Sequence, residues 1–303
     1  MQIVNFEMEK YRKFDSRYDL NYWYQIPDEW LKVDYDEFQS EIDIIVCRLT
    51  KENIRGLIID THLNKSEFDL SNLQRLSSLE YLSLGCGNYI NTKALDNLQN
   101  LKSLYIYGEN NGECLDLSKL RCLKRLIICN SMHNIVGIEN LTGLETLKLQ
   151  KFMRNDLQSI KGLSSLTALE LIQPRIVSLK GIEELKNMQC LTLFYCSKLT
   201  SLEYISELTE LKHLQLRNCS KLTNYTYLGQ CKLLKYLSIM NCGPIGDLQW
   251  MQTLNGLKFI GLVETNVLSG DVSPMLNVPD HRFTNKKNFN YYQNSKGIDI
   301  KRY

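Results

Sequence analysis

The sequence predicts an α/β solenoid, with short parallel strands along one side and 3₁₀ or short helical turns along the other. Three observations support this class. A motif with strand-like alternation recurs along most of the chain, the second half of each unit has apolar residues at every third position, and a helical stripe precedes the first unit. No unit of this kind can bury its apolar side alone, so neighbouring units must stack.

The repeated motif has the form L-x-x-L-x-L and occurs ten times, at intervals of 21 to 25 residues. Its copies begin at Ile54, Leu79, Leu101, Leu123, Leu144, Leu166, Met188, Leu211, Leu234 and Leu257. The fourth and sixth positions are Leu or Ile in every copy. Such alternation buries one face of a short strand, and the ten copies therefore predict one parallel sheet.

The segments between the motifs are predicted to form the turn side. Apolar residues recur there every third position, as at Ile176, Leu179, Ile182 and Leu185, and this period suits 3₁₀ turns.

The ninth motif position varies more than the fourth and sixth. It is Cys196, Cys219 and Cys242 in three successive repeats. Elsewhere it is Gly87, Glu109, Ser131, Phe152 or Pro174. We interpret the three cysteines as buried structural residues; a metal site is the alternative, but no histidine cluster accompanies them.

The motif and its spacing resemble the leucine-rich-repeat family, specifically its short 22-residue class, which includes the internalins and the phosphatase-1 regulatory subunit. The resemblance covers residues 54 to about 278. It implies a horseshoe with a parallel concave sheet, a convex side of 3₁₀ turns or short helices, and an N-terminal helical cap. In this family the ninth position is usually Asn or Cys, so the variation in the first repeats implies less regular turns there.

A cap helix is predicted at about residues 35–50, where one apolar stripe has spacings of three and four. The stripe consists of Leu31, Tyr35, Phe38, Ile42, Ile45 and Leu49. Asp34 and Glu37 fit a capping box, with Asp in place of Ser or Thr. Tyr22, Trp23, Tyr24 and Trp30 are expected to pack on this helix; a partner surface is the alternative.

At the other end, Val278, His281 and Phe283 occupy the leucine positions of an eleventh, degenerate motif. The remaining residues, 285–303, are polar and basic, and we expect part of them to be mobile. The predicted domains are therefore an N-terminal cap at 1–53, the repeat array at 54–278, and a closing strand with a basic tail at 279–303.

The formal net charge of +2 argues against a protein dedicated to nucleic acids or membrane surfaces. Residues 1–53 carry 7 Lys/Arg against 12 Asp/Glu, and residues 279–303 carry 6 against 2. We interpret both ends as solvated, with oppositely charged docking surfaces as the alternative. No secretory or membrane segment is visible, so a cytoplasmic location with reduced cysteines is expected unless a signal peptide has been removed.

The strand positions between the buried leucines are predicted to form a partner-binding surface. One cluster contains Tyr81, Tyr105, Tyr107 and Ile127, and a second contains Ile172, Phe194, Tyr195, Tyr236, Met240 and Phe259. The charged or polar residues among them are Arg125, Lys148, Glu170, His213 and Arg217. Tyr, Phe, Met and Arg are enriched in protein interfaces, although aromatic residues also favour strands in general.

One arrangement allows for chemistry. Cys190 and His213 occupy the same motif position in adjacent repeats, so their Cα atoms are expected about 5 Å apart, and Glu170 lies nearby. A Cys/His pair is the minimal set for nucleophilic catalysis. We expect no catalysis, because the pair lies on an open strand surface with no pocket and no evident oxyanion donors. No cofactor, metal or small-molecule substrate is expected.

The sequence therefore favours a module that binds a folded protein on its concave face. Inhibitors built on the resembled fold block enzymes, which suggests a role in neutralising an enzyme or toxin. The alternatives are a regulatory or targeting subunit of an enzyme, or a surface adhesin if a signal peptide has been removed.

Overall fold

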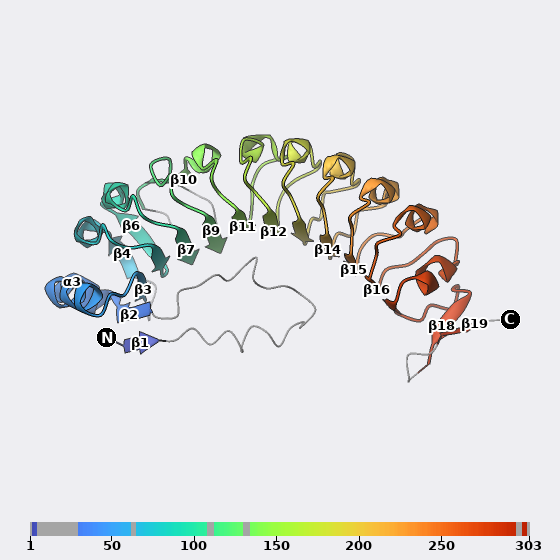
Figure 1. The fold of residues 1–303 in the computed structure, drawn as a ribbon, viewed down its shortest axis with the longest axis horizontal. Coiled ribbons are helices and arrows are strands. Elements are labelled where there is room, and N and C mark those ends of the chain that lie inside the picture. The colour runs from blue at the N-terminus through green and yellow to red at the C-terminus, as the bar shows by residue number, and fades with distance from the viewer. Residues whose placement is uncertain are drawn as a thin grey trace. The chain divides into compact units, whose positions relative to one another are not determined.

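The computed structural model describes residues 2–4, 30–61, 65–107, 112–129, 134–294 and 299–301. The chain divides into two compact units, Met1–Gln150 and Lys151–Tyr303. Within each unit the strands lie side by side along one side, and the 3₁₀ turns lie along the other (Figure 1). This is the predicted α/β solenoid.

In the first unit the strands follow the order β1-β2-β3-β5-β7-β9-β11. They are β1 (Gln2–Val4), β2 (Trp30–Asp34), β3 (Gly56–Asp60), β5 (Tyr81–Leu84), β7 (Ser103–Tyr107), β9 (Arg125–Cys129) and β11 (Thr146–Gln150). β1 is antiparallel to β2, and the other pairs are parallel. Leucines at the fourth motif position lie opposite one another, as Leu57 and Leu82 do, which aligns the buried columns.

The second unit contains a run of parallel strands in chain order. They are β12 (Ala168–Ile172), β13 (Cys190–Phe194), β14 (His213–Arg217), β15 (Tyr236–Met240), β16 (Phe259–Val263) and β17 (Asp280–Phe283). All ten predicted strands are confirmed, and each begins at the third motif residue. β17 is the predicted closing strand: His281 lies opposite Ile260, and Phe283 lies opposite Leu262.

The turn side carries the predicted 3₁₀ helices. In the first unit they are η2 (Ser71–Arg75), η3 (Thr92–Asn97) and η4 (Ile138–Asn140). In the second they are η5 (Gln158–Ile160), η6 (Ile182–Glu184), η7 (Ile205–Glu207), η8 (Thr226–Gln230), η9 (Gln249–Thr253) and η10 (Ser273–Asn277). The first unit also contains two short two-stranded parallel sheets. One pairs β4 (Lys65–Asp69) with β6 (Gly87–Ile90), and the other pairs β8 (Leu115–Asp116) with β10 (Ile135–Val136).

The cap helix forms in two parts, α2 (Tyr35–Ser40) and α3 (Ile42–Lys51). The capping box is confirmed: the Glu37 amide donates to Asp34 Oδ1 at 2.8 Å, and the Asp34 amide donates to Glu37 Oε2 at 3.1 Å. The cap is anchored to the array through the Asp69 amide, which donates to the Tyr35 hydroxyl at 2.8 Å. The side chains of Phe38 and Ile45 are fully buried.

Two details of the predicted N-terminal packing are wrong. Leu31 belongs to β2 and not to the helical stripe, and Trp30 lies on the opposite side of that strand from Leu31 and Val33. Because side chains alternate along a strand, burying Leu31 and Val33 in the core directs Trp30 onto the other face of the sheet. Residues 22–24 lie outside the described residues.

The C-terminal segment is more structured than predicted where it is described. Phe289 is buried, and its ring centroid lies 6.1 Å from that of Phe283. β18 (Tyr291–Gln293) and β19 (Asp299–Lys301) form an antiparallel pair. His281 connects this pair to β17: its Nε2 lies 2.6 Å from Asp299 Oδ2, and its Nδ1 lies 2.8 Å from the Val278 carbonyl oxygen. The domain boundaries at residues 53 and 278 remain predictions.

Of the helices in the described part of the chain, none combines the length and apolar character needed to cross a bilayer.

Candidate functional site

The candidate surface is the strand face, which we define as the side of each unit's strands opposite the leucine core. Residues at motif positions three, five and seven lie on it. We call them rows three, five and seven, and the residues at motif position eight form row eight. In-register pairing aligns each row across neighbouring strands, as Phe194, Arg217 and Met240 are aligned in row seven.

In the first unit, three predicted contact residues gather around Trp30. The Trp30 ring centroid lies 6.0 Å from that of Tyr81 and 6.0 Å from that of Tyr105. Trp30, Tyr105 and Ile127 form one buried cluster, and Tyr81 packs against it. Tyr105 and Ile127 are each only 4% exposed, so they support the face and do not offer open contact area.

The other predicted residues of this unit differ in exposure. Tyr107 is 42% exposed at the end of β7. Arg125 is 7% exposed and donates to the Ser103 hydroxyl at 3.2 Å, so its charge is largely withdrawn from solvent. Lys148 is half-buried. Tyr107 is therefore the most accessible aromatic anchor among the predicted residues of the first unit.

In row three of the second unit, aromatic rings form a stacked column. The His213 and Tyr236 ring centroids are 6.0 Å apart with planes 24° apart, and those of Tyr236 and Phe259 are 4.4 Å and 11° apart. The Phe259 ring lies over Gly261, where a Cβ atom would come within 3.1 Å of its Cζ. Tyr236 and Phe259 are 6% and 8% exposed, so this column also supports the face.

Row seven of the second unit is more accessible. It contains Ile172, Phe194, Arg217, Met240 and Val263, paired in register across five strands. Arg217 is exposed, and the four apolar side chains are half-buried. Within the described residues, no ion pair or hydrogen bond engages the Arg217 guanidinium.

Row eight has an unusual backbone. Left-handed φ angles of 49° to 59° occur in all six residues of this row in the second unit: Lys151, Gln173, Tyr195, Asn218, Asn241 and Glu264. Asn tolerates this conformation, and Asn241 Nδ2 donates to Asn218 Oδ1 at 2.6 Å. Tyr195 is bulkier, and its side chain is 45% exposed.

The three ninth-position cysteines lie directly behind row seven. The Cys242 thiol donates to the Met240 carbonyl oxygen at 3.3 Å, and the Cys219 thiol lies 3.6 Å from that of Arg217. Hydrogen bonding to Cys219 and burial raise the pKa of Cys196 and of Cys242. All ten cysteines are free. In the described ranges, no group of three or more His, Cys, Asp or Glu side chains has an arrangement that would hold a metal ion.

The structure places Cys190 and His213 side by side, as predicted. Cys190 is 6% exposed. Burial, with a further contribution from the Glu170 carboxylate, raises the pKa of the Cys190 thiol to about 12. Only the thiolate is a strong nucleophile, and the raised pKa disfavours the thiolate of Cys190 at neutral pH.

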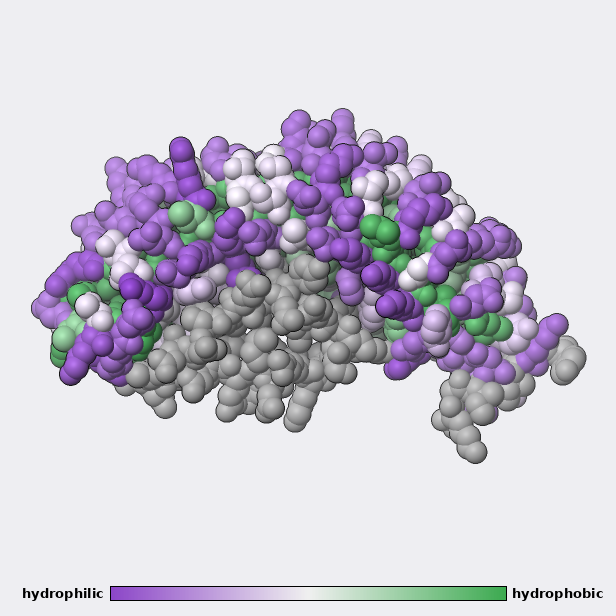
Figure 2. Space-filling view, viewed as in Figure 1, coloured by the Kyte–Doolittle hydropathy of each residue, from purple (hydrophilic) through white to green (hydrophobic). Residues whose placement is uncertain are grey.

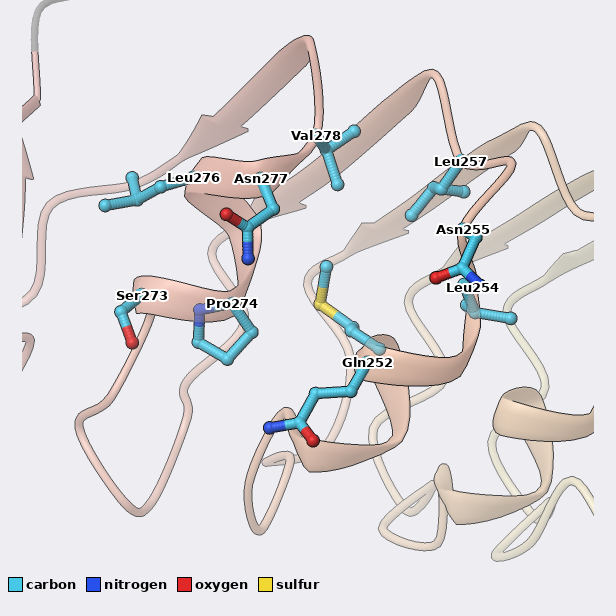
Figure 3. Close-up of a pocket in the computed structure, with 10 residues that line it drawn as sticks. Gln252, Leu254, Asn255, Leu257, Ser273, Pro274, Leu276, Asn277 and Val278 are labelled. Atoms are coloured by element: carbon cyan, nitrogen blue, oxygen red, sulfur yellow. The ribbon is translucent and has the colours of Figure 1, made fainter.

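A cavity that sequence reasoning missed lies between η9 and η10, with a volume of about 540 Å³ (Figure 3). Its walls include Met251, Leu254, Leu257, Pro274 and Val278, and its polar lining consists of side-chain amides and one hydroxyl. It carries no titratable group.

The visible surface in Figure 2 is mostly hydrophilic, with small hydrophobic patches between hydrophilic side chains.

No family model and no curated protein matches the sequence. Several solved structures share its fold. An internalin, InlF, from Listeria monocytogenes is 18% identical with a TM-score of 0.56, over 77% of this chain and 70% of that one. TLR13, in complex with ssRNA13, is 21% identical with a TM-score of 0.58, over 78% and 35%. The functional domain of InlJ from L. monocytogenes, which includes a cysteine ladder, is 19% identical with a TM-score of 0.51, over 73% and 52%. The chain has a leucine-rich-repeat fold.

Proposed function

We propose that this chain binds a folded protein partner on its strand faces and acts as a non-enzymatic interaction module. The observation that carries the proposal is row seven of the second unit. There an exposed arginine lies between partly exposed Phe194 and Met240. Phe, Met and Arg are enriched at protein interfaces, and Arg and aromatic residues dominate their binding energy.

The accessible residues narrow the predicted site. Tyr107, Phe194, Tyr195, Arg217 and Met240 are the proposed contacts. Of the remaining predicted residues, six are buried and support the face beneath the contacts: Tyr105, Arg125, Ile127, Glu170, Tyr236 and Phe259. The other four, Tyr81, Lys148, Ile172 and His213, are half-buried and lie on the same faces.

The charge of the strand faces favours a protein over a nucleic acid. Rows three to eight carry Arg125, Lys148, Lys151 and Arg217 against Asp60, Glu170 and Glu264. A nucleic-acid surface needs a denser run of Lys and Arg to neutralise phosphates. The ten free cysteines fit a reducing compartment, which supports a cytoplasmic location.

The test uses the tagged protein to capture partners from lysate of the native organism. The triple variant Tyr107→Ala, Phe194→Ala, Arg217→Ala is compared with a control triple, Val177→Ala, Lys198→Ala, Leu268→Ala, at exposed positions outside the rows. We expect one stoichiometric protein to be captured by the wild type and the control and lost by the strand-face triple. Equal capture by both triples would overturn the proposal.

The partner's activity then defines the role. We propose an inhibitor that neutralises an enzyme or toxin, in which case the captured partner loses activity as the complex forms. Undiminished activity in the complex would indicate a targeting subunit instead.

A further inference from the structure

The spacing of row seven in the second unit limits the kind of segment that it accepts. Neighbouring strands lie about 4.8 Å apart, so Phe194 and Met240, two strands apart, are separated by about 10 Å. Arg217 lies between them. An occupant must therefore present three side chains in a line with a repeat near 5 Å.

The positive charge of Arg217, at the centre of row seven, favours an occupant with an anionic group at the matching position. Arg217 is the cation of row seven, and no acidic side chain of the described residues engages it. Glu264, at the nearby end of β16, is paired with Lys286 at 2.7 Å. An acidic group of the partner, flanked by apolar side chains, would complement Arg217 and its neighbours.

We propose that row seven of the second unit receives an amphipathic α-helix of the partner, with a Glu or Asp at the centre of its apolar face. Helix residues i and i+7 are about 10.5 Å apart along the axis, which matches the separation of Phe194 and Met240. The acidic residue lies between them at i+3 or i+4, opposite Arg217. An extended segment repeats its side chains about every 6.8 Å and fits the row poorly.

The row is long enough for such a helix. Ile172 and Val263 extend it to five strands, a span of about 19 Å that three to four helical turns cover.

The exposed ring of Tyr195 is a second, independent observation. Tyr195 follows Phe194 directly and has a φ of 59°, where a non-glycine residue costs roughly 1–2 kcal/mol. All residues of row eight in the second unit share this conformation, Lys151, Gln173 and Glu264 among them, so it belongs to the turn after each strand. What distinguishes Tyr195 is its bulky aromatic ring, which is 45% exposed beside row seven and offers contact area to the same occupant.

The experiment uses two synthetic helical peptides of about four turns, with apolar residues at i and i+7 and either Glu or Lys at i+4. Binding to the full chain is measured by fluorescence anisotropy. We expect the wild type to favour the Glu peptide by about tenfold, because one peptide attracts Arg217 and the other repels it. Arg217→Glu should reverse this preference, and the matched control Lys198→Glu should leave it unchanged.

Equal affinity of the wild type for both peptides, or a preference that Arg217→Glu does not alter, would overturn the inference. Absence of binding by both peptides would also overturn it.

The inference rests on the proposed function, but the two fail separately. If the strand-face triple loses the native partner while the peptides do not discriminate, the interaction module stands and the helical occupant is rejected. If the triple keeps the partner, the proposed function itself fails.

Discussion

The indole of Trp30 packs directly on the backbone of Gly56, where a Cβ atom would lie only 2.9 Å from Cδ2 of the ring. The two residues are register partners on β2 and β3. Gly56 therefore leaves room for the indole to lie flat against the sheet and to reach Tyr81 and Tyr105.

Gly56→Ala should destabilise the first unit by about 1–2 kcal/mol. The added methyl group forces the indole away from the sheet. The free-energy cost of this overpacking exceeds the stabilisation that Ala gives by lowering the conformational entropy of the unfolded chain. The change is measured as the midpoint of urea unfolding followed by tryptophan fluorescence. Gly143→Ala is the control, because its Cβ would meet only ordinary contacts beyond 3.7 Å, and it should be neutral or slightly stabilising. A stable Gly56→Ala protein with unchanged fluorescence would contradict the observed packing.

The strands could be predicted from the sequence because their signal is local. Leu and Ile at the fourth and sixth motif positions fix which face is buried, and each predicted strand begins at the third position. The burial of the strand face could not be predicted in the same way. Tyr105 and Ile127 are covered partly by Trp30, which precedes the recognised repeats.

One signal for Trp30 was present in the sequence. Leu31 and Val33 alternate as the fourth and sixth motif positions do, and they pair with Leu57 and Ile59. Treating residues 30–34 as a half motif would have placed Trp30 in row three. The exposure of row seven, by contrast, depends on side-chain packing between repeats, which a single sequence does not specify.

Cys190 should resist alkylation in the folded protein. Its thiol is buried, and its pKa is raised to about 12, so almost no thiolate is present at pH 8. Iodoacetamide should modify the exposed Cys47, Cys114 and Cys122 first, as read by peptide mass spectrometry. Unfolding in urea should make Cys190 reactive. Rapid native labelling of Cys190 that His213→Ala abolishes would instead restore the nucleophile hypothesis.

Asp271 should contribute to stability in a pH-dependent way. Its Oδ1 accepts hydrogen bonds from the Ser273 hydroxyl at 2.6 Å and the Ser273 amide at 3.0 Å, and these hold its pKa below the ordinary value of 3.8. The unfolded chain therefore binds a proton at Asp271 more readily than the folded chain. Its stabilisation is present above about pH 4 and is lost as the pH falls through the lowered folded-state value.

Asp271→Asn removes this titration. The wild type should lose more stability than the variant between about pH 5 and pH 2, as measured by thermal unfolding at each pH. Glu203→Gln changes an exposed carboxylate outside this network and should keep the wild-type slope. Parallel pH profiles for the wild type and Asp271→Asn would show that these hydrogen bonds do not favour the carboxylate.

Tyr195→Asn should raise stability and lower affinity together. Asn relieves the left-handed strain at a φ of 59°, for a gain of about 0.5–1 kcal/mol, while the change removes an exposed ring beside Phe194. Gln173→Asn relieves the same backbone strain at a φ of 52°. It should stabilise the chain without lowering its affinity for the Glu peptide. Urea unfolding and peptide anisotropy measure the two effects separately. If both variants bind the Glu peptide as tightly as the wild type does, the Tyr195 ring does not contact the partner helix, and the contact surface ends at row seven.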